Sequence, residues 1–221
     1  MRTKRSRTVF EEESEFGGTV RVIEDHRERR LMVHGETLSV YPLDGDWRDV
    51  RREYWWHALV ERRLPRHPRA LLVGLGGGTQ LHLLRAIAKP RALTAVERDP
   101  VILRAAYAWF GLRDVGGVEY LCADAGTAAA SLLAAGRRFE YVMEDVDYGD
   151  GGERSVPLAL TLARLVARGG VFVANRHRRR EAAVVLEALR PLFHDVRERR
   201  VRREGENVLV VAARPRRATR S

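Results

Sequence analysis

A run of glycines at residues 74–78 constrains this chain more than any other stretch of its sequence. Apolar residues at 71–73 enter the run, and leucine and isoleucine recur at helical spacing over residues 81–87. This order predicts a strand, a tight turn and a helix. Glycine permits backbone angles and a close approach that a Cβ would forbid, while a helix start presents N–H groups and a positive dipole end. The stretch suggests a nucleotide-cofactor loop, although a buried strand that needs a tight exit also uses glycine.

Strand and helix patterns alternate through the rest of the chain. Strands are predicted at 93–97, 118–122, 139–144 and 171–175, and helices at 100–110, 125–135, 156–167 and 181–192. Such alternation implies right-handed crossovers and a parallel sheet covered on both faces. Two further strands, 194–201 and 206–213, flank a Gly205 turn and predict an antiparallel edge. We therefore expect an α/β fold with a doubly wound, mostly parallel, Rossmann-like seven-stranded sheet.

The N-terminal part has a different pattern. Residues 1–17 are charged and lack periodicity, which predicts a mobile tail, whereas short alternating runs over 18–48 predict a small antiparallel β-hairpin segment. An amphipathic helix is expected at 49–62. Residues 49–213 then form the cofactor-binding domain, and 214–221 form a basic tail.

The composition suits one globular unit. The chain has 221 residues and 45% hydrophobic content, enough to bury a sizeable core. A single cysteine, Cys122, rules out an internal disulfide and is expected in the core, and no apolar stretch approaches the length of a membrane span. We expect a soluble cytoplasmic protein with no membrane partner.

The net charge of +10 would normally point to nucleic acid. Only two of the 40 basic residues are lysine, however, and this bias looks like codon usage as much as selection for a partner. Arginines gather in three groups, at 176–180, 197–203 and 214–217. They indicate a solvated face or a phosphate-binding surface, so a nucleic-acid partner is not favoured.

Carboxylates stand where three successive strands are predicted to end. Glu97 ends the second strand, 23 residues after Gly74, where a carboxylate can accept hydrogen bonds from two ribose hydroxyls. Asp124 ends the third, where it can accept from an adenine amino group or cap the next helix. An acidic cluster over 144–148 ends the fourth. The loop reads Gly-x-Gly-x-x-Thr, and a dinucleotide has no need of Asp124, so we favour an adenosyl cofactor.

These residues also carry a family resemblance. It rests on the hairpin segment, Glu53-Tyr54 on a helix, the loop from Gly74 to Thr79, Glu97-Arg98-Asp99, Cys122-Ala123-Asp124-Ala125 and Asp145. In this order they resemble the spermidine synthase-like branch of class I S-adenosylmethionine-dependent transferases. The resemblance spans about residues 19–193. It implies a homodimer and a cofactor that is S-adenosylmethionine or its decarboxylated form. The cofactor-binding residues that it implies are Gly74, Gly76, Gly77, Gly78, Thr79, Glu97, Asp124 and Ala125.

The chain differs from that family at positions that bear on which group is transferred. Polyamine synthases carry an aspartate inside the loop that pairs with the aminopropyl ammonium, and Gly77 stands there instead. A carboxylate at that place would repel the methionine carboxylate of the intact cofactor. The family also has a second aspartate after the one at Asp145. Tyr148 stands at that place here, and Asp147 and Asp150 are nearby in the sequence. Methyl transfer to a small amine or related metabolite is therefore favoured. The alternatives are aminopropyl transfer to a polyamine, RNA methylation and a catalytically inactive scaffold.

The acceptor side follows from the same reasoning. Asp145 is the candidate base and Asp147 attracts a cationic acceptor, so these two are the predicted catalytic residues. Predicted substrate contacts are Tyr54, His57 and Tyr148. The adjacent Trp55 and Trp56 suit a pocket wall or, more often, a core. His177 suits a surface position, and we assign no metal ligands.

Overall fold

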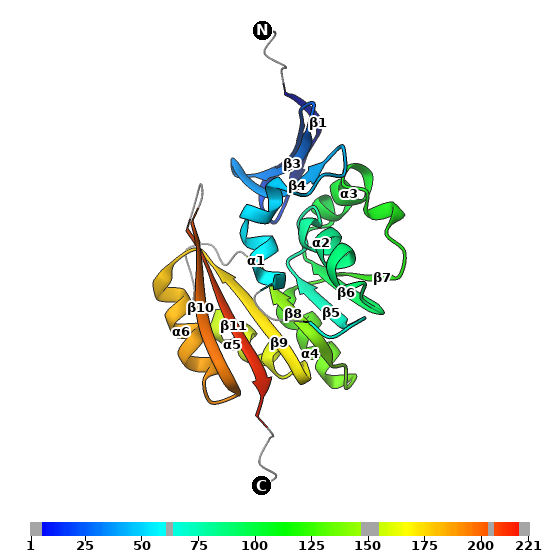
Figure 1. Cartoon of the computed structure of the whole chain (residues 1–221). Helices are drawn as coiled ribbons and strands as arrows, with labels where there is room; N and C mark the ends of the chain where they lie inside the picture. Colours follow the sequence, from blue (N-terminus) through cyan, green and yellow to red (C-terminus); the bar gives the residue numbers. More distant parts are fainter. Residues whose placement is uncertain (1–5, 61–63, 147–154, 203–205, 217–221) are drawn as a thin grey trace.

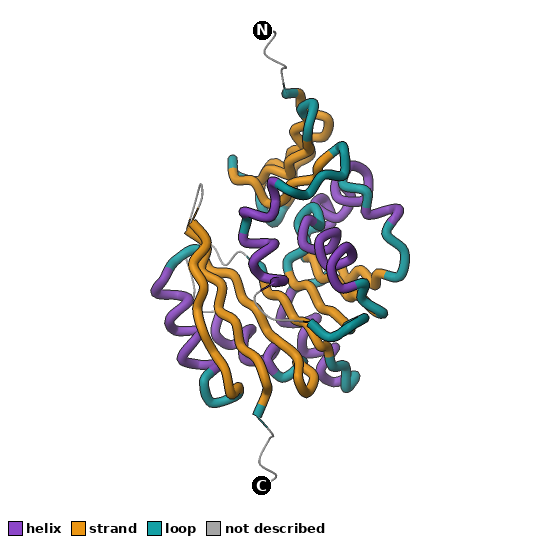
Figure 2. The backbone as a smooth tube through the Cα atoms, viewed as in Figure 1, coloured by secondary structure: helices purple, strands orange, loops and turns teal. Residues whose placement is uncertain are grey.

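The computed structural model describes residues 6–60, 64–146, 155–202 and 206–216 (Figure 1). The chain forms a seven-stranded sheet with helices on both faces and a separate four-stranded antiparallel sheet near its N-terminal end (Figure 2). The α/β class, the mostly parallel sheet and the additional N-terminal β segment are thus confirmed.

The order of the large sheet is β10-β11-β9-β8-β5-β6-β7. Five neighbouring strands are parallel: β5 (Arg69–Val73), β6 (Ala92–Glu97), β7 (Val118–Cys122), β8 (Phe139–Glu144) and β9 (Val166–Arg176). The antiparallel pair consists of β10 (Phe193–Arg202) and β11 (Glu206–Pro215). The last strand, β11, lies between β9 and β10, so the antiparallel edge is two strands wide.

Helices cover both faces of this sheet (Figure 1). One face packs against α4 (Ala125–Ala134), α5 (Ser155–Ala163) and α6 (Arg179–Leu189), and the other packs against α1 (Tyr54–Val60) and α2 (Thr79–Ala88). Successive residues of β5 alternate between the two cores: Leu71 and Val73 face the first set of helices, Ala70 and Leu72 the second. Both faces are therefore apolar, which explains the continuous hydrophobic run before the glycines.

The small sheet has the order β1-β2-β3-β4. Its strands are β1 (Arg7–Ser14), β2 (Gly18–Glu24), β3 (Glu28–Val33) and β4 (Glu36–Pro42). It packs against α3 (Pro100–Trp109), whose Val101, Ile102 and Ala105 form a third core with Val22 and Leu31.

The prediction of a mobile tail over residues 1–17 was wrong for residues 7–14, which form β1. Its charged residues pair across the strands, Arg7 with Glu24 and Glu11 with Arg21, at 2.6 Å in each ion pair. Val9 and Phe10 pack against the third core. Because the partners of these charges lie on another strand, the pairing is not visible in the local sequence. A charged strand of this kind therefore has the same sequence pattern as a disordered segment.

Other boundaries differ by a few residues. The predicted helix at 49–62 is a 3₁₀ turn, η1 (Asp49–Arg52), followed by α1, with extended backbone at Glu53 between them. The helix predicted at 156–167 ends at Ala163, and β9 begins at Val166. β11 continues to Pro215, into the predicted basic tail. None of the helices in the described part of the chain has the length and hydropathy needed to cross a membrane.

Candidate active site

The predicted site residues follow four neighbouring parallel strands, β7, β6, β5 and β8, at one edge of the sheet. Parallel strands present their carboxyl ends at the same edge, where ligands bind in open α/β sheets. Asp124 comes after β7, Glu97 ends β6, the glycine loop follows β5 and Asp145 follows β8. The fold therefore brings the predicted cofactor and acceptor residues to a common edge.

The glycine loop is tightly enclosed. Gly74 has a φ of +86°, and a Cβ there would lie 2.1 Å from the backbone oxygen of Asp145. Gly78 has a φ of +88°, and a Cβ there would lie 2.8 Å from the Leu112 side chain. Only glycine fits both the positive φ and the lack of space, and the loop packs directly against the Asp145 backbone after β8.

The N–H groups of the loop are bound within the protein. Glu97 Oε2 accepts from the Leu75 and Gly76 N–H groups at 3.2 and 3.0 Å, and Ser39 Oγ accepts from Gly77 N–H at 2.8 Å. The Thr79 hydroxyl accepts from Val40 N–H at 2.9 Å and donates to Val40 O at 2.8 Å. Strand β4 thus fixes the loop, and the Thr79 hydroxyl is used to hold the loop against β4.

Glu97 is a buried carboxylate held in one orientation. Besides the two loop N–H groups, it accepts from Asp99 N–H at 3.1 Å through Oε1. Burial raises the pKa of Glu97, while these hydrogen bonds oppose the shift. Three donors on two oxygens leave acceptor capacity, because a carboxylate has about four lone-pair sites.

Asp124 caps helix α4. Its Oδ1 accepts from Thr127 N–H at 3.0 Å, as the capping alternative predicted, yet the residue is exposed. Ala123 N–H donates to Glu97 O at 3.1 Å, which ties the ends of β7 and β6 together, and Ala125 begins α4. The expectation that Cys122 is a core residue was wrong: it is exposed at the end of β7.

Asp145 lies between two hydrogen-bond donors. Tyr54 Oη donates to Oδ2 at 2.7 Å, and Asn175 Nδ2 donates to Oδ1 at 2.9 Å. Although the residue as a whole is half-buried, burial of its carboxylate raises the pKa of Asp145 against these bonds. Burial and the Asp145 charge also raise the pKa of Tyr54 well above its ordinary value, so the phenol stays protonated and donates. Asp147 and Tyr148 lie outside the described residues.

Asn175, a neighbour of Asp145, was not predicted from the sequence. Asn175 ends the apolar part of β9 and also donates to Asn207 Oδ1 at 3.0 Å, which links β9 to β11. Behind it, the buried Arg176 and Glu144 form a two-pronged ion pair, at 2.9 and 2.7 Å. A polar residue directly after an apolar strand was the available signal for Asn175.

The remaining candidates lie around this group. Arg199 Nη2 donates to His57 Nδ1 at 2.8 Å, so His57 contacts β10, and burial together with the Arg199 charge lowers the pKa of His57. Trp55 is buried in the core of α1 and α2, as the core alternative predicted, and Trp56 stacks with Arg51. His177 is exposed.

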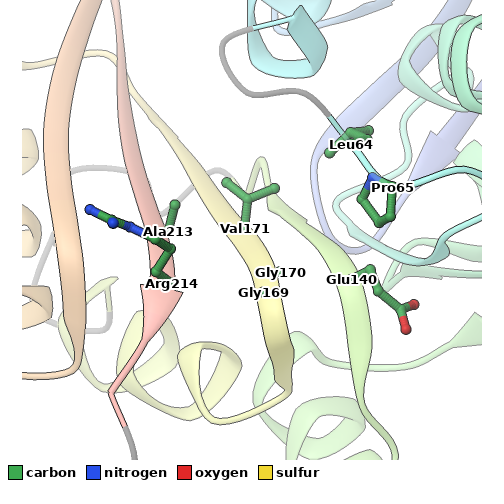
Figure 3. Close-up of a pocket in the computed structure, with 8 residues that line it drawn as sticks. All are labelled: Leu64, Pro65, Glu140, Gly169, Gly170, Val171, Ala213 and Arg214. Atoms are coloured by element: carbon green, nitrogen blue, oxygen red, sulfur yellow. The ribbon is translucent and has the colours of Figure 1, made fainter.

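A shallow pocket lies at another part of the molecule (Figure 3). Leu64, Pro65, Glu140, Gly169, Gly170, Val171, Ala213 and Arg214 line it. Glu140 lies near the amino end of β8, away from the edge that carries Asp145, and it is bound by Arg69 at 2.9 Å and Arg91 at 3.2 Å. This pocket takes no part in the candidate site.

Solved structures with the same arrangement belong to two groups of transferases. A spermidine synthase in complex with the transition-state analogue AdoDATO superposes with a TM-score of 0.70 and 16% identity, over 94% of this chain and 73% of that one. Human methyltransferase-like protein 13 in complex with SAH superposes with a TM-score of 0.59 and 26% identity, over 75% of this chain and 78% of that one. The chain has the spermidine synthase-like methyltransferase fold.

Sequence comparison adds a relative that is named as a methyltransferase. The eEF1A lysine and N-terminal methyltransferase of Danio rerio is 36% identical over 81 residues, which are 36% of this chain. The match covers only 12% of that protein's length. No protein-family model matches the chain.

Proposed function

We propose that this chain is an S-adenosylmethionine-dependent methyltransferase that acts on an amine. The observation that carries the proposal is the meeting of Asp124, Glu97, the glycine loop and Asp145 at the carboxyl ends of adjacent strands. The fold supports it, and so does the named activity of the zebrafish relative, whose acceptors, lysine and the N-terminus, are amines.

The residues of the edge suit an adenosyl group. Ribose hydroxyls and the adenine amino group are hydrogen-bond donors, and Glu97 and the exposed Asp124 are acceptors on adjacent strands. Four of the five residues from Gly74 to Gly78 lack a Cβ atom, which lets the loop turn tightly at this edge of the sheet. We assign the ribose to Glu97, the adenine to Asp124 and Ala125, and the remainder of the cofactor to the loop from Gly74 to Gly78. When bound, the cofactor supplies a methyl group carried on a sulfonium.

The packing around Gly77 favours the intact over the decarboxylated cofactor. A Cβ on Gly77 would lie 2.8 Å from both Phe110 Cδ1 and Ser39 Cβ. An aspartate, which polyamine synthases carry at this place, therefore has no room here. This favours methyl transfer over the aminopropyl alternative, despite the fold shared with spermidine synthases.

Asp145 is assigned as the group that receives or orients the proton of the nucleophile. An amine attacks a methyl group only when it is unprotonated, and a partly desolvated carboxylate with a raised pKa is a better base than an exposed one. Tyr54 holds one oxygen of this carboxylate. We further propose Tyr54 and His57 as the border of the acceptor space, and we keep Asp147, Tyr148, the homodimer and the cytoplasmic location as predictions.

Calorimetry with three adenosyl compounds tests the proposal. S-adenosylmethionine and S-adenosylhomocysteine are expected to bind, and decarboxylated S-adenosylmethionine to bind at least about ten-fold more weakly, a difference of about 1.4 kcal/mol. Glu97→Gln should weaken binding about ten-fold or more. The matched control is Glu187→Gln, because Glu187 is exposed on α6.

The other outcomes identify the alternatives. Tighter binding of the decarboxylated compound would favour aminopropyl transfer, and no binding of any of the three would favour the scaffold. An RNA affinity that falls steeply with salt would favour an RNA acceptor.

A further inference from the structure

Asn175 lies at the carboxyl end of β9, outside the set of predicted site residues. We propose that Asn175 is a positioning residue of the acceptor side, whose amide donates one N–H to the Asp145 carboxylate and holds it in one orientation. This rests on the proposed function, because the orientation of Asp145 matters to the reaction only if that carboxylate faces the nucleophile.

The orientation of the Asn175 amide is dictated by its neighbours. An ionised carboxylate only accepts hydrogen bonds, so the group that faces Asp145 Oδ1 must be Nδ2. The same NH₂ group also donates to Asn207 Oδ1. Turning the amide over would place Oδ1 against two acceptors, so the side chain is locked with both hydrogens in use.

The oxygen of the Asn175 amide is in a different position from its nitrogen, because it accepts no hydrogen bond from the described residues. Asn175 is only 3% exposed, and its buried Oδ1 has no hydrogen-bond partner among the residues that the structure describes. Leaving a buried acceptor unpaired destabilises the folded state. An amide that merely filled space would be costly at this position, so we assign its role to the N–H that it donates to Asp145.

Asp145 is thus held from two sides. Tyr54 of α1 donates to one oxygen and Asn175 of β9 donates to the other. The charged groups that act on it besides these are His177 and Arg176, both of which favour its ionised form. Arg176 is itself bound by the buried Glu144, so its charge stays in place when Asn175 is changed.

The test is a pH titration of the Asp145 carboxyl by ¹³C NMR of protein labelled at aspartate, with D145N to assign its signal. N175D keeps the shape of the side chain but cannot donate when ionised, and N175A removes the group. Both are expected to raise the pKa of Asp145 by about 1 unit or more, because the ionised carboxylate loses a donor and, in N175D, also gains a like charge beside it. N175A measures the loss of the donor alone. N207A, the matched control, keeps the bond from Asn175 to Asp145 and should shift it by less than half as much.

An unchanged pKa of Asp145 in both Asn175 variants would overturn the proposal, even if the variants were less stable. S-adenosylhomocysteine binding is measured on the same proteins and is expected to stay within about two-fold of the parent chain. Failure of that compound to bind the unaltered protein would contradict the proposed function instead. The titration would still show whether Asn175 holds Asp145.

Discussion

The Ser39 hydroxyl accepts a hydrogen bond from the Gly77 N–H at 2.8 Å. A side chain of the small N-terminal sheet thereby fixes the backbone of the loop that we assign to the cofactor. The Thr79 hydroxyl forms a second connection between the loop and β4, since it bonds to both the N–H and the carbonyl of Val40. The two sheets therefore behave as one unit around the loop, and changes in β4 should be felt in cofactor binding.

Removal of the Ser39 hydroxyl leaves the buried Gly77 N–H without its acceptor. Ser39→Ala is expected to lower the free energy of unfolding by about 1–2 kcal/mol, as is usual for an orphaned buried donor, and to weaken S-adenosylmethionine binding. Urea unfolding and calorimetry measure the two effects. Ser131→Ala, at an exposed position on α4, should change neither by more than about 0.5 kcal/mol.

Gly77→Asp places a side chain where Phe110 and Ser39 already lie. We expect a loss of stability of about 1–3 kcal/mol or more from overpacking, with no gain in affinity for decarboxylated S-adenosylmethionine. The control is Gly116→Asp, because a Cβ there meets nothing within 4 Å. A stable Gly77→Asp variant that prefers the decarboxylated compound would contradict the assignment of Gly77.

Asp145→Asn should separate activity from stability. Methyl transfer is expected to fall by about 10²–10⁴-fold, the usual contribution of a general base. Because burial raises the pKa of Asp145, its ionised form disfavours folding, and this penalty grows as pH rises from the ordinary aspartate pKa through the raised one. The variant should thus be at least as stable as the parent at neutral pH. A marked loss of stability there would count against this account of the site.

Tyr54→Phe removes one donor from the same carboxylate. The pKa of Asp145 should rise further, so the acid limb of the pH–rate profile should move to higher pH while affinity for the cofactor is unchanged. An acid limb at its original pH would show that Tyr54 does not act through Asp145.

His82 should make stability depend on pH. It is part of α2, stacks on Trp47 with ring centroids 5.4 Å apart and lies within hydrogen-bond distance of Phe110 O, and burial lowers its pKa. The unfolded chain takes up this proton first, so stability is full above the ordinary histidine pKa and falls as pH drops below it. Thermal unfolding of His82→Gln between pH 5 and pH 8 should show a smaller decline. Part of the decline should remain, because the pKa of His57 is lowered as well.

The large sheet was predictable because its signals are local. Apolar runs such as 71–73 are buried on both faces, and Asp99 directly before Pro100 is the N-cap of its helix, which is a local pattern. The first strand was missed because its charges are paired with residues of other elements, such as Glu24 of β2 and Arg104 of α3. Local periodicity carries no information about such partners.

The candidate site was predictable only in part, for a similar reason. Glu97 and Asp145 follow strands directly, and position alone marks them. Ser39 and Asn175 act through contacts over 38 and 30 residues of sequence. The surroundings of Ser39 carry no local signal, and the only local signal for Asn175 is its position at the end of an apolar run. The hydroxyl of Thr79 was assigned to the cofactor because its use by β4 is visible only once the two sheets are together.

The insertion of β11 between β9 and β10 has a consequence for biosynthesis. Asn207, which binds Asn175, is supplied by this last strand, whereas the glycine loop and Glu97 are made much earlier. While the chain is still being translated, the cofactor half can assemble from neighbouring segments, but β9 keeps an open edge until β11 pairs with it. The half of the site around Asp145 therefore matures last, after residues 206–215 have left the ribosome.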